Sequence, residues 1–246
     1  MDVRIFASKK EMGKAAAAAG AEKIREALAD GGEARIVMAS AASQFEVVEA
    51  LAEESDIAWE RVILFHLDEY IGLSADHPAS FSRFLRERFI ANLPGELQAF
   101  HAINGENEAE AECARVGGLL AGKAPSVAFI GIGENGHIAF NDPPADFETE
   151  APYLVVGLDE VCRQQQVGEG WFPGLQSVPT HAMSMSVRQI LKAHRIVCVV
   201  PDARKAVAVQ KTVEGVVSPD LPATILQEHD DCVLFLDEPS AGLLPS

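Results

Sequence analysis

The sequence VAFIGIGENGHIAFND, at residues 127–142, is the stretch that decides the fold class. It begins with four apolar residues, typical of a buried strand, and continues into a glycine-rich turn that carries an imidazole, His137, and a carboxylate, Asp142. Residues 61–67 have the same form, because this apolar run is followed directly by Asp68. Open α/β sheets keep their chemistry beyond the carboxyl ends of their strands. We therefore expect the ends of these two strands to converge on one crevice.

Apolar runs alternate with helical patterns along the whole chain. Such alternation is typical of a largely parallel sheet that is covered by helices on both faces. The length of 246 residues fits one large α/β domain. Strands are predicted at residues 3–6, 34–39, 61–67, 127–130, 153–158, 195–200 and 232–236, and helices at residues 9–28, from about 44, at 80–90, 106–120 and 187–192, and after 202.

Two helix starts carry side chains that can cap them. Ser43 and Glu46 have the spacing of a capping box, in which two side chains satisfy free backbone N–H groups. Asp202 is expected to cap a later helix. The segment at residues 168–179 is rich in turn formers and is expected to form a long ordered loop or lid.

The charge balance restricts the partners. Acidic residues outnumber basic ones by 37 to 20, which gives a formal net charge of −17. This charge repels polyanions and anionic membranes, so we expect neither a nucleic-acid partner nor a membrane. A small anionic substrate remains compatible, because backbone N–H groups and one or two cations can override a distant negative field.

Four cysteines, Cys113, Cys162, Cys198 and Cys232, are scattered along the chain, without Cys-x-x-Cys spacing and without a signal peptide before them. This pattern is typical of reduced thiols, so we expect a cytoplasmic protein. Three of the four lie in or beside apolar runs, where a free cysteine is usually a small core residue.

Two segments are expected to lie at helix N-termini and to favour an anion. Residues 40–44 form a turn of small residues before one helix, and residues 202–205 precede another. Free N–H groups and the helix dipole attract anions there, and Lys205 adds a full charge. Each segment alone is typical of an ordinary capped helix. Together they predict a phosphate pocket.

His137 follows a sharp turn at residues 133–136, so backbone geometry rather than packing along an element holds it. Its imidazole can act as a general acid or base near neutral pH, or it can serve as a structural hydrogen-bonding group. Asn135 and Asp142 favour the catalytic interpretation, because they can orient the ring and fix its tautomer.

Asp68 and Glu69 end an apolar strand, where side chains alternate, so only one of them can face the crevice directly. A desolvated carboxylate at this place can take a proton from carbon. His66 or His77 could instead join Asp68 in a metal site, but no His-x-x-x-His pair or carboxylate ladder completes a coordination shell. We therefore expect no metal and no cofactor.

Two motifs together resemble the glucosamine-6-phosphate deaminase/isomerase family. One is LDEYIGL at residues 67–73 with HPAS at residues 77–80, and the other spans residues 131–143. The resemblance extends from the first strand to about Pro239. The related 6-phosphogluconolactonases share the Gly-x-Gly-x-x-Gly-His core, but they typically continue differently after the His and carry Asp-Glu-Arg where this chain has DEY at residues 68–70.

The resemblance implies a single three-layer Rossmann-like domain over residues 1–246. It also implies an enzyme that converts glucosamine 6-phosphate and water to fructose 6-phosphate and ammonia without a metal. Asp68 would move the C2 proton to C1, while His137, supported by Asn135 and Asp142, would open the sugar ring. The residues expected to bind the substrate are Ser40, Ala41, Ala42, Ser43, Glu69, Gly136, Arg163 and Lys205. A homo-oligomer is compatible with the sequence.

The chain departs from the family pattern at three points. The phosphate turn usually reads Thr-Gly-Gly-Thr, whereas residues 40–43 here read SAAS. Asp142 stands where Glu is usual. An Arg that usually precedes an aromatic pair is absent before Trp171, and Arg163 or Arg188 is the candidate to replace it.

Two other functions are compatible with these motifs. A lactone hydrolase would use His137 to activate water and would not need Asp68 as a carbon base. A non-catalytic sugar-phosphate sensor would carry altered catalytic residues. The presence of Asp68, Asn135, His137 and Asp142 together argues against the sensor.

Overall fold

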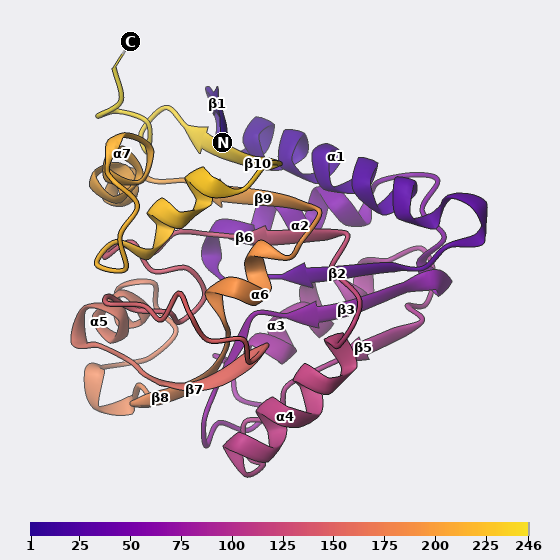
Figure 1. Ribbon diagram of the computed structural model, residues 1–246, viewed down its shortest axis with the longest axis horizontal. Coiled ribbons are helices and arrows are strands. Elements are labelled where there is room, and N and C mark those ends of the chain that lie inside the picture. Colours follow the sequence, from indigo (N-terminus) through magenta and orange to yellow (C-terminus); the bar gives the residue numbers. More distant parts are fainter. Residues whose placement is uncertain (246) are drawn as a thin grey trace.

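Seven strands form the main sheet in a computed structural model that describes residues 1–245 (Figure 1). Their order is β1-β10-β9-β6-β2-β3-β5, and every neighbouring pair is parallel. All but the short edge strand β5 were predicted from apolar runs. The bounds are β1 (Asp2–Phe6), β2 (Ala34–Met38), β3 (Val62–His66), β5 (Ala99–His101), β6 (Val127–Ile130), β9 (Arg195–Val200) and β10 (Cys232–Asp237).

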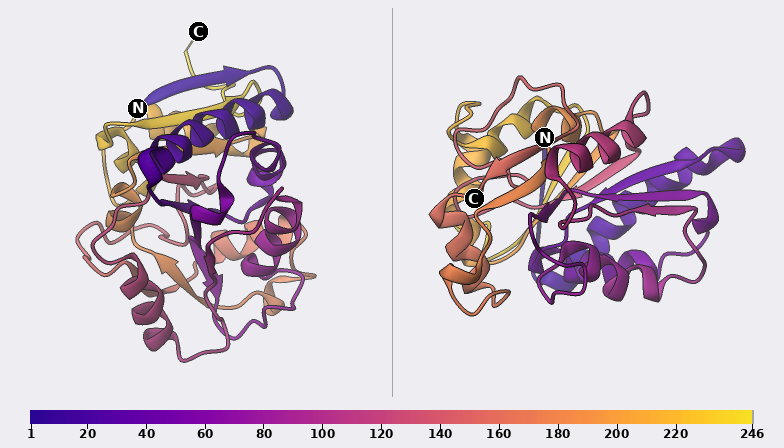
Figure 2. Two further views of the ribbon diagram at one scale, coloured as in Figure 1. Left: turned by 90° about the vertical axis from the view of Figure 1, so that its right-hand side faces the viewer. Right: turned by 90° about the horizontal axis from the view of Figure 1, so that it is seen from below.

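Successive residues of each strand point to opposite faces, so the sheet separates two apolar cores. In β2, Ile36 and Met38 pack in one core with helices α1, α2 and α3, whereas Val37 packs in the other with α4, α6 and α7. The predicted α/β fold, with a largely parallel sheet and helices on both faces, is confirmed (Figure 2). The bounds are α1 (Lys9–Leu28), α2 (Phe45–Ala52), α3 (Phe81–Arg88), α4 (Ala109–Leu120), α6 (Val187–Leu191) and α7 (Ala206–Glu214).

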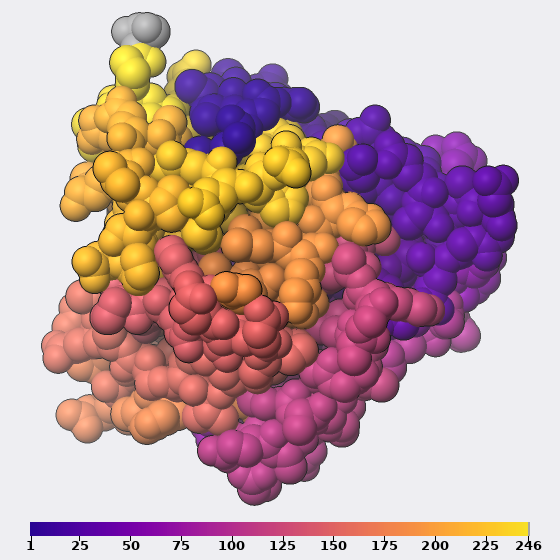
Figure 3. Space-filling view, viewed as in Figure 1, coloured from indigo at the N-terminus to yellow at the C-terminus, as the bar shows by residue number. Residues whose placement is uncertain are grey.

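The two ends of the chain meet at one edge of the sheet. Strand β1 pairs with β10 in a register that joins Asp2 to Val233 and Phe6 to Asp237. In the space-filling view the first residues, in indigo, lie against the yellow C-terminal part (Figure 3). Within residues 1–245, no helix has the length and apolar character needed to cross a membrane.

A second, antiparallel sheet of three strands stands beside the main one. It consists of β4 (Asp68–Tyr70), β8 (His181–Met185) and β7 (Tyr153–Gly157), in the order β4-β8-β7. The strand predicted at residues 153–158 is present as β7, but it pairs with β8 in the small sheet rather than with the parallel strands. No apolar run in the sequence predicts β8. Strand β4 follows β3 almost directly, so the small sheet orients Asp68 at the end of the main strand.

The chain changes direction between two neighbouring strands. From β2 it proceeds through β3 to β5 at one edge, and from β6 it proceeds through β9 to β10 near the other. Strands β2 and β6 are paired, so the loops that follow them part to opposite sides. Parallel α/β sheets bind ligands in the crevice that forms at such a point. Residues 39–44 and 131–137 flank this crevice.

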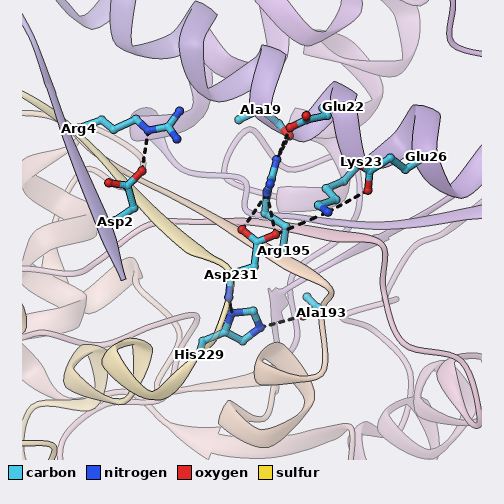
Figure 4. A network of polar contacts seen from close by, with 10 residues as sticks. All are labelled: Asp2, Arg4, Ala19, Glu22, Lys23, Glu26, Ala193, Arg195, His229 and Asp231. Atoms are coloured by element: carbon cyan, nitrogen blue, oxygen red, sulfur yellow. Dashed lines mark hydrogen bonds and ion pairs between the residues drawn. The ribbon is translucent and has the colours of Figure 1, made fainter.

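Arg195, at the start of β9, ties helix α1 to the amino-terminal ends of two strands (Figure 4). Its guanidinium donates to the Asp231 carboxylate at 2.9 Å, and to the Glu22 carboxylate and the Ala19 carbonyl of α1 at 2.6 and 3.1 Å. Burial alone would raise the pKa of Asp231, but the hydrogen bond and the charge of Arg195 lower it. This network lies at the opposite end of the strands from the crevice, so it serves the fold.

We expect Arg195→Met to lower the free energy of unfolding by about 2 kcal/mol at neutral pH, because two carboxylates and a carbonyl lose their donor. The pKa of Asp231 is lower in the folded state than in the unfolded chain, so this stabilisation is lost as the pH falls through the folded pKa. Denaturant unfolding at neutral and acidic pH measures both effects. In the control variant Arg83→Met, an exposed pair with Glu87 and an exposed hydrogen bond to the Asp76 carbonyl are lost, which should cost about 1 kcal/mol or less. Equal losses in the two variants would contradict the role of Arg195.

Candidate active site

A cavity of about 120 Å³ opens at the crevice. It is lined by the loops after β2, β3, β6 and β9, which are neighbours in the sheet, and by helix α5 (Glu160–Gly168). Asp68 and His137 both line it, so the two strand ends converge as expected. The other lining residues that bear on the chemistry are Lys9, Ser40, Ala41, Ala42, Ser43, Gly133, Gln165, Gln166, Glu169, Arg204 and Lys205.

His137 lies at the centre of a polar cluster formed by the turn after β6. Its Nδ1 atom is 3.1 Å from Asp142 Oδ1, and its backbone N–H donates to Asn135 Oδ1 at 3.1 Å. Asn135 also donates from Nδ2 to Asp142 Oδ1 at 3.0 Å. Burial alone would raise the pKa of Asp142, but the neighbouring His137 and Asn135 outweigh it and lower that pKa. The arrangement holds an ionised carboxylate against one ring nitrogen, which orients the imidazole.

Two glycines make room for this ring. A Cβ atom at Gly133 would collide with the His137 imidazole, so only glycine allows the ring to fold back over the turn. Gly136 has φ +85°, and a Cβ there would meet the Leu221 side chain at 2.5 Å. Gly136, expected among the substrate-binding residues, does not line the cavity and instead shapes the turn.

Asp68 is a buried carboxylic acid that faces the cavity. Burial, with a smaller contribution from the charge of Glu69, raises the pKa of Asp68 to about 8. A base whose pKa lies near the working pH combines a usable ionised fraction with strong proton affinity. The side chain is therefore suited to take a proton from a bound molecule and to return it.

Glu69, the next residue, points away from the cavity. Its carboxylate accepts four hydrogen bonds, from the backbone N–H groups of Tyr70, Phe81 and Ser82 and from the hydroxyl of Ser80. Burial raises its pKa, and these bonds oppose the shift. Glu69, expected among the substrate-binding residues, does not line the cavity, because alternation along β4 turns it toward the N-terminus of α3. It fixes the loop between β4 and α3 instead.

We expect Glu69→Ala to lower the free energy of unfolding by about 3 kcal/mol or more, since buried donors of Ser80, Phe81 and Ser82 lose their acceptor. Glu69→Gln keeps one acceptor oxygen and should cost clearly less. Thermal or denaturant unfolding of the two variants measures the difference. An alanine variant as stable as wild type, but with weaker substrate binding, would instead return Glu69 to the substrate site.

Two imidazoles that the sequence offers as metal ligands beside Asp68 have other roles. His66 is fully buried and accepts the backbone N–H of Ile103 at 2.8 Å, and burial lowers its pKa to about 3. His77 accepts the N–H of Ala79 through Nδ1 and stacks on the Phe172 ring. Neither imidazole lines the cavity.

Lys205 is the buried cation of the cavity. Lys205 is only 7% exposed, and its ammonium group takes part in none of the ion pairs within residues 1–245. Burial lowers its pKa, while the carboxylates of Glu169 and Glu134 oppose the shift. Ser40 lines the same cavity, and its buried hydroxyl has no hydrogen-bond partner in the described chain. Because buried polar groups are normally paired, these two groups indicate a place for an anion.

The turn between Ser40 and α2 is not built as the sequence suggests. A short 3-10 turn at Ala42–Gln44 leads into α2, and no side chain caps either element. The predicted capping box of Ser43 and Glu46 is therefore wrong; the Ser43 hydroxyl lies at the cavity and accepts from Gln44 Nε2 at 3.1 Å. The predicted Asp202 cap is present, since its carboxylate accepts the N–H of Arg204.

The structure brings neither of the expected arginines to the cavity. Arg163 donates to the backbone carbonyls of Leu175 and Val178 at 2.8 and 3.0 Å, so it braces the segment after α5. Arg188 pairs with exposed glutamates, among them Glu150 at 2.6 Å. Both guanidinium groups are engaged in holding loops.

Two further cations, Arg204 and Lys9, line the cavity, although no motif in the sequence marks them as site residues. Arg204 precedes Lys205, and its guanidinium lies 3.6 Å from the Asp202 carboxylate and 3.8 Å from that of Glu134. Lys9 lies 3.7 Å from Asp202. Lys9 could not be predicted as a site residue, because it is remote in sequence from residues 202–205. It comes near them only through the pairing of β1 with β10.

Helix α5 also went unrecognised, although Asp159 caps it by accepting the N–H of Cys162 at 2.6 Å. It presents Gln165 and Gln166 to the cavity, and Glu169, which follows its last residue, also lines the cavity. The following segment at residues 168–179 is a loop with one 3-10 turn, in line with the expected ordered loop.

The fold and the crevice define an α/β protein with an acid–base site at the switch point of a parallel sheet. The chain belongs to the family of glucosamine-6-phosphate isomerases and 6-phosphogluconolactonases, whose model matches residues 7–235. A glucosamine-6-phosphate deaminase of Listeria innocua is 34% identical over 230 residues, which cover 92% of this chain and 96% of that protein. Glucosamine-6-phosphate deaminase 1 of Bacillus subtilis is 34% identical over 79% of this chain and 80% of its own.

Solved structures agree with this assignment. A monomeric glucosamine-6-phosphate deaminase superposes with a TM-score of 0.90 at 31% identity, over 99% of this chain and 100% of that chain. A putative 6-phosphogluconolactonase of Neisseria gonorrhoeae has a TM-score of 0.78 at 18% identity, over 97% of this chain and 100% of that one. The match to the 6-phosphogluconolactonase, at 18% identity, shows that that protein and the present chain share a fold.

Proposed function

We propose that this protein is a glucosamine-6-phosphate deaminase, which converts glucosamine 6-phosphate and water to fructose 6-phosphate and ammonia. One observation carries the proposal: a single cavity combines the oriented imidazole of His137 with Asp68, whose pKa is raised to about 8. The reaction needs two acid–base groups, because the ring must open before the C2 proton becomes acidic. The names of the relatives support the same reaction.

In the proposed mechanism His137 opens the ring. Its Nε2 atom takes the proton of the anomeric hydroxyl and returns it to the ring oxygen, which gives the open-chain aldehyde. Asp142 holds Nδ1 and stabilises the imidazolium that forms meanwhile, and Asn135 holds Asp142 in place. The C2 proton then lies next to a carbonyl group and is acidic enough for a carboxylate base.

Asp68 moves that proton from C2 to C1. Removal from C2 gives an enolamine, and return of the proton to C1 gives an imine at C2, which water hydrolyses to the ketone and ammonia. The burial that raises the pKa of Asp68 makes its carboxylate a stronger base than an exposed aspartate. The same acid form can then deliver the proton to C1.

The proposed phosphate site lies in the same cavity. Lys205 supplies the buried charge, and the turn of Ser40, Ala41, Ala42 and Ser43 supplies hydroxyl and backbone N–H groups. The alanines in this turn remove the close backbone approach that glycines allow, so side-chain hydroxyls and Lys205 carry more of the binding. We further propose that the protein works in a reducing cytoplasm, since its four cysteines are free and buried.

A panel of substrates tests the function. Glucosamine 6-phosphate, its C2 and C4 epimers and 6-phosphogluconolactone are each incubated with the protein, and ammonia, ketose phosphate and free acid are measured. Ammonia and ketose phosphate formed together from an amino sugar phosphate support the proposal. Hydrolysis of the lactone alone would make the protein a lactonase, and tight binding without turnover of any compound would make it a sensor.

A further inference from the structure

Three side chains of different chemistry, those of His137, Asp142 and Cys162, lie close together. A ring nitrogen of His137, a carboxylate oxygen of Asp142 and the Cys162 thiol all lie within 4.8 Å of one another, and the nitrogen nearest Asp142 is Nδ1, at 3.1 Å from Oδ1. His137 and Asp142 come from the turn after β6, and Cys162 comes from the first turn of α5. Cys162 is 1% exposed, as expected of a core cysteine, but its thiol joins this polar group.

One atom of this group, a ring nitrogen of His137, lacks a hydrogen-bond partner among the described residues. His137 Nδ1 is buried and makes no well-aligned hydrogen bond, although Asp142 Oδ1 is only 3.1 Å away. Nitrogen, oxygen and sulfur donors together are the set that Zn²⁺ prefers. In a tetrahedral site with ordinary Zn²⁺ bond lengths the donors lie about 3.3–3.7 Å apart. Side-chain movements on the order of 1 Å would therefore close this group around the ion.

We propose that His137, Asp142 and Cys162 form an inhibitory site for Zn²⁺. Three protein ligands would leave the fourth position of the ion to water. On binding, the Cys162 thiol gives its proton to solvent, and a Zn–S bond forms. One of the three ligands, Asp142, also lines an open surface cavity of about 430 Å³ that is separate from the substrate cavity.

The effect on activity rests on the proposed function, in which His137 Nε2 accepts the anomeric proton. A neutral imidazole has one nitrogen that bears a proton and one that accepts. With Zn²⁺ on Nδ1, the ring proton must sit on Nε2, so Nε2 can no longer act as the base. The ion would also take Asp142 away from its role of orienting the ring. Occupancy therefore blocks ring opening while the substrate cavity stays open.

Direct Zn²⁺ binding tests the site without any assay of activity. Purified protein is stripped of metal with EDTA and titrated with Zn²⁺ in competition with a chromophoric chelator, for the wild type and for Cys162→Ser and Cys162→Ala. Cys113→Ser is the matched control, because Cys113 lies on α4 away from the group. We expect one high-affinity ion in the wild type and the control, and at least about tenfold weaker binding in both Cys162 variants. Co²⁺ should give a thiolate charge-transfer band that only the Cys162 variants lose.

Inhibition is measured in parallel on glucosamine 6-phosphate, with each variant compared with its own rate in EDTA. Zn²⁺ should inhibit the wild type and Cys113→Ser, EDTA should restore them, and the Cys162 variants should need at least about tenfold more Zn²⁺. A protein that binds Zn²⁺ through Cys162 but deaminates no substrate would refute the proposed function and leave the site intact. Wild-type affinity for Zn²⁺ in both Cys162 variants, or full activity of the Zn²⁺-loaded wild type, would overturn the inhibitory site.

Discussion

Asp68→Asn should reduce the turnover of glucosamine 6-phosphate by about 10² to 10⁴-fold, the range expected when a positioned base is lost. Substrate binding should stay within about tenfold of wild type, because the carboxylate acts on a proton in the transition state rather than on the ground state. In deuterated water the wild type should place deuterium at C1 of the product, and the variant should place almost none. Steady-state kinetics, equilibrium binding and NMR of the product measure the three effects.

The exposed acid Asp76 offers a matched control, since Asp76→Asn makes the same chemical change on the surface loop after β4. It should keep the wild-type rate. If Asp68→Asn kept more than about a tenth of the wild-type rate, Asp68 would not be the carbon base. Normal turnover with no deuterium at C1 in the wild type would point to a base that never exchanges with solvent.

The raised pKa of Asp68 also predicts a stability effect. Its folded pKa of about 8 lies above the unfolded value of 3.8, so the folded state holds this proton over a pH range in which the unfolded chain has released it. The free energy of unfolding therefore falls as the pH rises from about 4 to about 8. Above that range the folded protein carries the full free-energy cost of ionising the buried Asp68 carboxyl. Asp68→Asn removes it and should raise the melting temperature by at least about 3 °C near pH 9, with little change near pH 4. Thermal unfolding at both pH values measures this, and an unaltered melting temperature near pH 9 would contradict the raised pKa.

Six of the seven strands of the main sheet could be predicted, because each of the six carries its own signal, whereas the short edge strand β5 does not. Parallel strands that are buried on both faces read as continuous apolar runs, and residues 127–130 and 196–200 are clear cases. The sharp turn before His137 could likewise be predicted from its own glycines. Because this turn follows a buried strand, the sequence also predicts that the His137 imidazole lies at the end of that strand. The convergence of Asp68 and His137 then followed from the parallel arrangement of the strands.

Features set by long-range pairing could not be predicted. Strand β8 contains Ser184 and has little strand character of its own, and it forms because β4 and β7 lie on either side of it. The direction of Glu69 depends on the N-terminus of α3, eleven or more residues later in the chain. Arg163 was expected at the cavity because its charge is visible in the sequence, whereas the carbonyl groups of Leu175 and Val178, to which it donates, could not be predicted as its partners.

Lys205→Met should weaken the binding of glucosamine 6-phosphate by about 10- to 150-fold, which corresponds to the 1.5–3 kcal/mol of a charged hydrogen bond. The binding of glucosamine, which lacks the phosphate, should change little. Burial disfavours the charged form of Lys205, as its lowered pKa indicates, so the empty protein carries a desolvated cation that an arriving phosphate neutralises. The methionine variant should therefore be at least as stable as wild type without ligand, and less stabilised than wild type when the phosphorylated sugar is added.

Two further variants separate the phosphate site from general effects of charge. Lys192→Met removes a surface lysine that pairs with Glu150, and it should bind both sugars like the wild type. Arg163→Met removes the donor to the carbonyls of Leu175 and Val178, so it should lower the melting temperature more than the affinity. Calorimetric titration with the two sugars, together with thermal unfolding, tests all three variants. If Lys205→Met bound glucosamine 6-phosphate as tightly as wild type while Arg163→Met lost affinity, the phosphate would bind beside α5, and Arg163 would have to leave its carbonyl partners to reach it.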